Sequence, residues 1–342
     1  MVGVPQMQFI WSRMQSHEYN CSIHMPPGEE WSEKYGTVNH ALGLYFIMAG
    51  LLCELAYVPC IGPIYAHSKS PCYKIMLWLC FADIVALGVT MMFGSFLYMG
   101  AVHCSFPAYS ALTGALSVGS WCASCLGCCL LVFDRLLEIQ GIGHYLEGKR
   151  VWFALALTTL YGFYFGLFSP PFLPNSTVGA DFSFPCIPGL EEIDYTSFAT
   201  IGNNIIVALI NSVMNISVCV LVTRKKRMIM DKSVRGNDLD IKMYLQIIFI
   251  SASNITASYL YVFENFVTVS PALIIIGNIA WQFNHGAPPF IYLLMNRTVQ
   301  NHLKESPVFG KIFRLIRPRT QISRIKNEPT KSIQSIVAIS RI

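Results

Sequence analysis

Ionisable side chains inside long apolar stretches are the first candidates for chemistry in this chain. Asp83 lies in the middle of one apolar stretch, and Glu54 lies in another with no obvious cationic partner. Charges inside a membrane are rare, costly and often functional. A desolvated carboxylate readily takes up a proton or a cation. We therefore predict that Asp83 is a proton or sodium site; a hydrogen-bonded packing residue is the alternative.

Asp134 and Arg135 are adjacent opposite charges at the end of a third apolar stretch. One interpretation is a switch, in which Asp134 holds Arg135 at rest and releases it when the sixth stretch moves. The alternative is a simple ion pair whose charged groups reach the membrane surface. The position at the end of the stretch favours the switch.

Pro289 and Tyr292 occur near the end of the seventh apolar stretch. A proline removes a helical hydrogen bond and allows a kink. A tyrosine one turn later could then repack towards Arg135. The alternative is an interfacial tyrosine of the aromatic belt.

Amide and imidazole side chains in the fifth and seventh stretches are ligand candidates. Asn203, Gln282 and His285 are the chosen candidates. Side chains of this kind form hydrogen bonds between membrane helices or line a polar cavity. Hydrogen bonding between helices is the favoured interpretation.

Seven apolar stretches must position these residues. A hydrocarbon core of about 30 Å needs roughly 20 apolar residues in a helix. The stretches show no alternation of polar and apolar residues, so helices are expected rather than barrel strands. The predicted spans are 38–65, 72–98, 106–138, 151–170, 198–223, 242–266 and 271–295.

The distribution of basic residues predicts the orientation of these spans. Of the 24 Lys and Arg residues, all except Arg13 and Lys34 fall in loops on one side or in the C-terminal tail. The positive-inside rule then places the N-terminus outside and the C-terminus in the cytoplasm. We predict an all-α membrane protein, a seven-transmembrane helix bundle in a lipid bilayer. An extracellular segment (1–37) precedes the bundle (38–295), and a cytoplasmic tail (296–342) with a disordered distal part follows it.

Three cysteines fall on the predicted outer side: Cys21, Cys104 and Cys186. Oxidising conditions favour pairing there. We predict a Cys104–Cys186 disulfide, with Cys21 either free or in a rearranged pairing, because connectivity cannot be deduced from sequence alone. Asn20 and Asn175 begin glycosylation sequons on the same side.

Other classes of function are less well supported. The seventh span has no lysine for a Schiff base, so retinal is excluded, and no other cofactor is expected. The net charge of +5 is explained by the cytoplasmic face, which argues against nucleic-acid binding. Neither clustered catalytic groups nor a metal site is seen, so an enzyme is not expected. A small-solute transporter is the alternative, although no inverted repeat supports it.

Taken together, these motifs resemble rhodopsin-like G protein-coupled receptors, and more closely the nematode serpentine chemoreceptors of class T. Asp83, Asp134-Arg135, Pro289 with Tyr292 and the Cys104/Cys186 pair occur in the order seen in the rhodopsin-like receptors. Motifs typical of the class T branch are Tyr19-Asn20-Cys21-Ser22, Glu54-x-x-Tyr57-x-Pro59-Cys60, Ser70-Pro71-Cys72-Tyr73-Lys74-Ile75-Met76, Gly100-Ala101-Val102-His103-Cys104-Ser105 and Trp121-Cys122.

The resemblance implies a chemosensory receptor that detects a small environmental molecule and activates a heterotrimeric G protein. It further implies the plasma membrane, with sensory cilia as the expected place. Two positions depart from the motifs of rhodopsin-like receptors: Leu136 replaces an aromatic residue and Pro288 replaces an asparagine. A receptor-like protein that no longer couples is therefore a further alternative.

The expected ligand cavity lies among the outer halves of the third, fifth, sixth and seventh spans, under residues 171–197. The outer half of the third span carries the small residues Gly114, Ser117 and Ser120 and no carboxylate. This argues against an amine anchored to that span. A small neutral or weakly polar ligand is expected.

Overall fold

A computed structural model of the chain describes residues 3–23, 25–231, 241–267 and 270–306, without the side chains of 228–231. The chain divides into two units, residues 1–302 and residues 303–342. The seven long helices and the site described below belong to the first unit. The predicted disorder of the distal tail concerns residues outside the described part.

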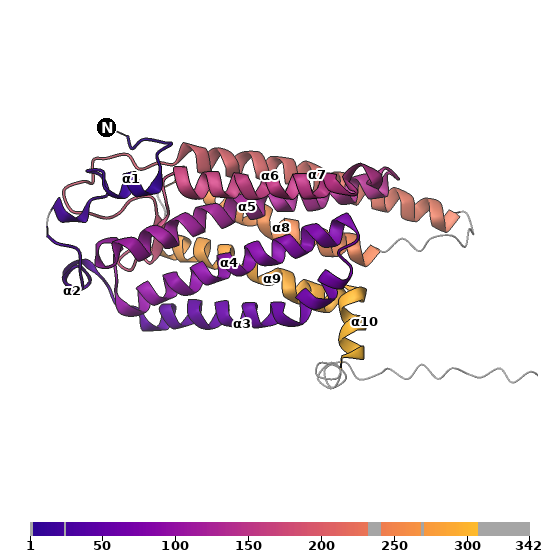
Figure 1. The fold of residues 1–342 in the computed structure, drawn as a ribbon, viewed down its shortest axis with the longest axis horizontal. Helices are drawn as coiled ribbons and strands as arrows, with labels where there is room; N and C mark the ends of the chain where they lie inside the picture. Colours follow the sequence, from indigo (N-terminus) through magenta and orange to yellow (C-terminus); the bar gives the residue numbers. More distant parts are fainter. Residues whose placement is uncertain (1–2, 24, 232–240, 268–269, 307–342) are drawn as a thin grey trace, which may run out of the picture. The chain divides into compact units, whose positions relative to one another are not determined.

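The described residues of the first unit contain seven long helices, and each overlaps one of the predicted spans (Figure 1). They are α3 (His40–Ala66), α4 (Pro71–Met99), α5 (Pro107–Ile139), α6 (Lys149–Phe168), α7 (Phe198–Asp231), α8 (Ile241–Glu264) and α9 (Pro271–Met295).

Short elements precede, connect and follow these helices. They are α1 (Ile10–Met14), η1 (Cys21–Ile23), α2 (Glu30–Tyr35), η2 (His103–Ser105), η3 (Gly143–Leu146), β1 (Leu173–Asn175), β2 (Ala180–Phe182) and α10 (Arg297–Glu305). Strands β1 and β2 form an antiparallel hairpin in which Pro174 lies opposite Asp181. The hairpin lies between α6 and α7 in the sequence, within the segment predicted to cover the cavity.

Local sequence explains where several helices begin and end. Pro71, Pro107 and Pro271 each open a helix, at a position where a missing N–H costs nothing. Ser270 caps α9 because its hydroxyl accepts a hydrogen bond from the backbone N–H of Leu273. Gly100 ends α4 in the left-handed conformation with φ +69°.

Helix α5 is central to the bundle. It packs against α4, α6, α7 and α8, while α9 closes the bundle by packing against α3, α4 and α8 (Figure 1). The buried face of α5 consists mainly of Ser, Gly, Ala and Cys together with Val118, Trp121, Leu131 and Val132. Small side chains let membrane helices approach closely. This confirms the predicted fold class, an all-α helical membrane bundle.

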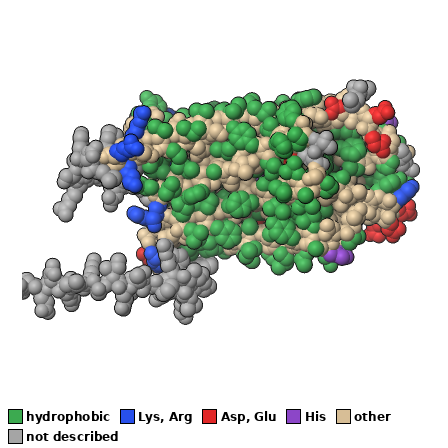
Figure 2. All heavy atoms as spheres, turned by 180° about the vertical axis from the view of Figure 1, so that it is seen from behind, with side chains coloured by type: hydrophobic (Ala, Val, Ile, Leu, Met, Phe, Trp, Pro, Cys, Tyr) green, Lys and Arg blue, Asp and Glu red, His purple; other side chains and the backbone are tan. Residues whose placement is uncertain are grey.

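The surface of the bundle is strongly apolar. Figure 2 shows a wide band of hydrophobic side chains, with Lys and Arg gathered at one end and Asp and Glu mostly at the other. Large side chains such as Phe153, Phe163 and Ile216 are more than 60% exposed. An apolar surface of this extent is typical of contact with lipid.

Six of the seven long helices, α3 to α8, are long and apolar enough to cross a membrane by length and composition. Helix α9 has comparable length, with 25 residues, but it is interrupted by polar side chains. Gln282, Asn284 and His285 of α9 are buried inside the bundle. The lower hydropathy of α9 therefore reflects its inward-facing polar residues.

A seam of glycines joins α5 to α6. A Cβ atom added at Gly162 would lie 2.7 Å from Cβ of Ala123 and 2.8 Å from the carbonyl oxygen of Gly119. A Cβ added at Gly166 would lie 2.7 Å from the carbonyl oxygen of Ala115. Each contact is closer than van der Waals separation allows, so glycine permits this approach of the two backbones.

The N-terminal segment and the loop between α6 and α7 cover the end of the bundle that holds the hairpin, which we call the hairpin end. The backbone N–H of Val4 donates to the carbonyl of Asp194 at 2.9 Å. Gln6 donates to the carbonyl of Thr196 at 2.9 Å, and the Tyr195 hydroxyl donates to the carbonyl of Glu18 at 2.9 Å. These bonds hold the loop in place.

The disulfide of this region differs from the prediction. Cys104 pairs with Cys21, with Cα atoms 5.4 Å apart, so the predicted Cys104–Cys186 bond is wrong. Cys186 is a free cysteine whose thiol lies 3.8 Å from the carbonyl oxygen of Phe184. The disulfide therefore joins η1 of the N-terminal segment to η2, in place of the loop between α6 and α7 that the sequence predicted as its partner. Hydrogen bonds to the N-terminal segment hold that loop.

The two sequons on the predicted outer side have different environments. Asn20 is partly exposed, and its side chain accepts a hydrogen bond from the N–H of Ser22 at 3.0 Å. Asn175 is only 2% exposed, and its side chain accepts from the N–H of Thr177 at 2.8 Å. The folded protein has no room for a glycan at Asn175, which leaves Asn20 as the predicted glycosylation site.

Candidate functional site

A buried polar centre joins four helices around Asp83. Its Oδ1 atom lies 2.8 Å from Nδ1 of His285 on α9 and accepts a hydrogen bond from the Ser124 hydroxyl of α5 at 3.2 Å. Its Oδ2 atom accepts a hydrogen bond from the Tyr57 hydroxyl of α3 at 2.9 Å. Asp83 is therefore a hydrogen-bonded carboxylate that links α3, α4, α5 and α9.

His285 is the partner that the sequence did not reveal for Asp83. The pair becomes an ion pair when the imidazole is protonated. The imidazole also lies 3.5 Å, through Nε2, from the side-chain nitrogen of Asn284. The proposed proton or sodium site at Asp83 includes His285 in its surroundings.

A cavity of about 560 Å³ opens at the hairpin end. The hairpin, the segment after it, and helices α4, α5, α7, α8 and α9 supply its walls. Its polar lining includes Ser117, Thr200, Asn204, Asn265 and Asn278. Its aromatic lining includes Phe93, Phe172, Tyr195, Tyr261 and Trp281. Space and chemistry of this kind suit a small organic ligand.

Three carboxylates also line this cavity: Asp181 of β2, Glu264 at the end of α8, and Glu191. Asp181 Oδ1 and Glu264 Oε1 are buried and have no hydrogen-bond partner among the described residues. Both carboxylates interact electrostatically with Tyr261. Burial raises the pKa of Asp181 to about 8, far above its ordinary value of 3.8.

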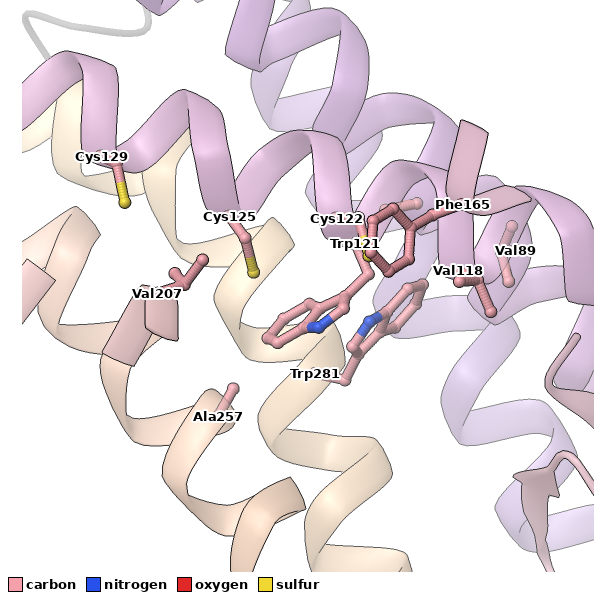
Figure 3. Close-up of a cluster of buried hydrophobic side chains, with 11 residues drawn as sticks. Val89, Val118, Trp121, Cys122, Cys125, Cys129, Phe165, Val207, Ala257 and Trp281 are labelled. Atoms are coloured by element: carbon pink, nitrogen blue, oxygen red, sulfur yellow. The ribbon is translucent and has the colours of Figure 1, made fainter. Parts of the chain in front are cut away.

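Trp281 connects the cavity to the polar centre. It lines the cavity, and its ring centroid lies 4.7 Å from that of His285. Trp121 also lies near the imidazole, with ring centroids 6.0 Å apart. Figure 3 shows Trp121 and Trp281 within one cluster of buried apolar side chains. A ligand that displaces the Trp281 side chain would therefore change its contact with His285.

None of the three sequence-predicted ligand residues lines the cavity. Asn203 accepts a hydrogen bond from the Tyr161 hydroxyl at 2.9 Å and donates to Asn204 at 3.0 Å. Gln282 donates to the carbonyl of Phe46 at 3.0 Å, and His285 is held by Asp83. These side chains mainly connect helices, as the favoured interpretation expected.

Sequence reasoning missed the cavity carboxylates because they lie outside the apolar stretches or at their ends. Asp181 belongs to the hairpin and Glu264 is the last residue of α8. The available signal was a run of acidic residues without any Lys or Arg between α6 and α7.

The Asp134–Arg135 pair lies near the other end of α5, and both residues are buried. The guanidinium of Arg135 donates to Asp134 Oδ2 through Nε at 2.9 Å and also through a terminal nitrogen. Arg135 also interacts electrostatically with Cys72 of α4 and Tyr244 of α8. The structure thus places the arginine between helices, where movement of α8 would change its surroundings.

Pro289 and Tyr292 both face the bundle interior. The carbonyl of Pro289 lies 3.6 Å from the Cys60 thiol of α3. Tyr292 is fully buried, and its hydroxyl has no hydrogen-bond partner among the described residues. A buried hydroxyl without a partner loses about 1–3 kcal/mol. Tyr292 can therefore gain stabilisation by moving to a partner.

The cysteines of α5 are packing residues in this structure. Cys122, Cys125 and Cys129 belong to the cluster around Trp121 (Figure 3). Among the described residues, one group has the geometry of a metal site: His103 with Cys21 and Cys104, whose thiols are joined as the disulfide. Burial lowers the pKa of His103 to about 4, so its ring is neutral at physiological pH.

Comparisons with known proteins agree with this architecture. The crystal structure of squid rhodopsin is similar, with a TM-score of 0.54, 11% sequence identity, and 81% of this chain and 86% of that chain covered. The fold is therefore similar to that of rhodopsin. The sequence profile described as serpentine type 7TM GPCR chemoreceptor Srt matches residues 7–314. The chain belongs to this family of chemoreceptors, a non-enzymatic class of multi-pass integral membrane proteins. No curated protein matches it in sequence.

Proposed function

We propose that the protein binds a small environmental molecule in the cavity at the hairpin end and activates a heterotrimeric G protein at the opposite end. Such a receptor works by population shift, because the ligand binds the active arrangement more tightly than the inactive one. The basic residues at the Arg135 end support placing that end in the cytoplasm. The plasma membrane, with sensory cilia as its expected region, is part of this proposal.

The observation that carries the proposal is the buried Asp134–Arg135 pair between α4, α5 and α8. Removing one partner of a buried charge pair leaves the other charge uncompensated, which is strongly unfavourable. Loss of the Asp134 carboxylate would free the guanidinium for another acceptor. The pair therefore has the properties of a switch that a G protein can read.

A set of contacts links the cavity to the polar centre around Asp83. Trp281 lines the cavity and contacts His285, and His285 is bonded to Asp83. Tyr292 interacts electrostatically with Asp83 and lacks a hydrogen-bond partner in the described part of the chain. These contacts are a physical route, and coupling along it is part of the proposal.

The helices offer little support for a transporter. In the described residues, each of the seven long helices runs without interruption from end to end. Transporters commonly bind their substrates at broken helices near the middle of the membrane. The leading proposal remains a receptor.

The test is nucleotide exchange on a panel of G proteins in membranes that contain the full chain. Asp134→Asn should raise the basal exchange rate severalfold, because it releases Arg135. Adding Arg135→Ala to that variant should return the rate to that of empty membranes. Basal exchange needs no identified ligand.

Arg150→Ala is the matched control, since Arg150 is an exposed arginine at the start of α6. It should leave the elevated rate of Asp134→Asn unchanged. Surface amounts of all variants are measured in parallel. Unchanged exchange in Asp134→Asn, or retained exchange after removal of Arg135, would contradict the proposed switch.

A further inference from the structure

The charged side chains that line the hairpin-end cavity, among the described residues, are all acidic. Asp181, Glu191 and Glu264 line it, and no Lys, Arg or His occurs among the described residues that line it. Asp181 and Glu264 each keep one buried carboxylate oxygen without a protein partner in the described part of the chain. Buried polar atoms normally have partners, so these two oxygens call for a donor that the protein does not supply.

Much of the remaining lining of the cavity is aromatic. Phe93, Phe172, Tyr195, Tyr261 and Trp281 all line the cavity. The faces of aromatic rings attract cations, and this attraction strengthens where water is excluded. Aromatic faces combined with carboxylates are the usual chemistry for recognition of an ammonium group.

We propose that the cavity selects an organic cation, a protonated amine or a quaternary ammonium compound, with Asp181 and Glu264 as counter-charges and the aromatic rings as its walls. The inference rests on the proposed function in one respect, because it takes this cavity as the receptor's ligand site. It replaces the expectation of a neutral ligand. That expectation considered carboxylates on α5 only, whereas the carboxylates come from the hairpin and α8.

A metal ion fits the cavity less well. A metal needs several ligand atoms close together, and the described residues form no such group from Asp181 and Glu264. The volume of about 560 Å³ suits an organic molecule. The carboxylates and the aromatic rings therefore favour an organic ammonium ion.

The titration of Asp181 gives the proposal a second signature. Its pKa of about 8 means that the empty cavity holds a neutral carboxyl at physiological pH. A bound ammonium ion stabilises the ionised form and expels that proton. Affinity for the cation should therefore fall as the pH drops below about 8, by up to about tenfold per pH unit. Among the described residues, the other titratable groups that line the cavity with Asp181 are Glu264, Glu191, Cys186, Tyr195 and Tyr261.

The loop between α6 and α7, which borders the cavity, is also negatively charged. The segment between α6 and α7 contains Asp181, Glu191, Glu192 and Asp194 and neither Lys nor Arg. A potential of one sign raises the local concentration of oppositely charged ligands and their association rates. Cations are thus favoured before they reach the cavity.

The experiment compares charged and uncharged probes of the same shape on the purified full chain in lipid nanodiscs. Phenethylamine is paired with phenethyl alcohol, and choline with its uncharged tert-butyl analogue. Binding is measured from the shift in thermal unfolding across a range of probe concentrations. At least one ammonium probe should bind about tenfold or more tightly than its neutral partner, which corresponds to about 1.4 kcal/mol.

Asp181→Asn and Glu264→Gln should each reduce this preference at least about fivefold. Glu192→Gln is the matched control: Glu192 lies in the same loop, is exposed and does not line the cavity. It should keep the preference of the unmodified chain. Loss of affinity at low pH in the unmodified chain tests Asp181 without any substitution.

Two outcomes overturn the inference: equal or tighter binding of the neutral partners across both pairs, and a preference that survives Asp181→Asn together with Glu264→Gln. Neither outcome touches the Asp134–Arg135 switch, which is measured by basal exchange without ligand. Conversely, a chain that selects ammonium ions but never activates a G protein would refute the proposed function alone.

Discussion

At the scale of single residues, the molecule keeps two carboxyl groups in very different surroundings. Asp83 accepts hydrogen bonds from Tyr57 and Ser124 and lies against His285. Asp181 has a buried oxygen with no partner among the described residues. The fold supplies hydrogen-bond partners to Asp83, whereas the unpartnered oxygen of Asp181 makes the ligand-free protein less stable. A cationic ligand would supply the missing partner and remove this destabilisation.

The pKa of Asp181 leads to a prediction about stability and pH. Because the folded state binds this proton more tightly than the unfolded state, the free energy of unfolding falls as pH rises between about 4 and about 8. Thermal unfolding of the ligand-free chain in nanodiscs should show this decline. Asp181→Asn should make the profile flatter over the same range. A profile that is identical in Asp181→Asn would show that the carboxyl titrates normally.

The burial of Asp83, Asp134 and Arg135 in the bundle was predictable because a charge inside an apolar stretch is visible in the sequence. The partner of Asp83 was not, since His285 is 202 positions away and only the folded bundle brings the two together. Asp181 was missed for a related reason. A carboxylate in a polar loop looks solvated until the hairpin folds over the cavity.

At the scale of helices, packing depends on how closely two backbones approach. Gly119 and Gly162 lie at the contact between α5 and α6, and α5 in turn carries Trp121 and Arg135. A wider α5–α6 spacing would therefore shift both the cavity and the switch. Helix positions were predictable because apolar length identifies a span. The contact between particular glycines depends on helix rotation, which the apolar pattern leaves open.

Gly162→Ala should destabilise the bundle by about 1–3 kcal/mol, because its new methyl group meets Ala123 and the carbonyl of Gly119. Gly202→Ala is the control, since nothing lies within 4 Å of a Cβ at that position in α7. It should be neutral or stabilise the helix by up to about 1 kcal/mol. Thermal unfolding of both variants in the same nanodiscs provides the comparison. Equal stability of the two variants would argue against a tight α5–α6 seam.

At the scale of the whole first unit, the N-terminal segment acts as part of the receptor. It is joined to η2 by the Cys21–Cys104 disulfide and to the loop after α6 by hydrogen bonds from Val4 and Gln6. The fold class was predictable from apolar length and charge asymmetry. The disulfide was not, because three outer cysteines allow several pairings and the choice depends on where the N-terminal segment folds.

Cys21→Ser and Cys104→Ser should have the same effect, a loss of about 2–5 kcal/mol and reduced surface delivery. Cys186→Ser should be delivered normally, because Cys186 is a free cysteine. Surface labelling of a tagged chain on intact cells measures all three variants. A delivery defect in Cys186→Ser that matches the other two would restore the pairing first predicted from the sequence.

The buried Asn175 makes the order of events during biosynthesis important. Oligosaccharide is transferred to a sequon while the chain is still open, but Asn175 belongs to β1 and is only 2% exposed in the folded protein. A sugar chain attached early would keep β1 from its place, and that copy could not mature. On the predicted topology, closure of the hairpin and sugar transfer would therefore compete for the same residue. The number of working receptors in a cell would then depend on which of the two is faster.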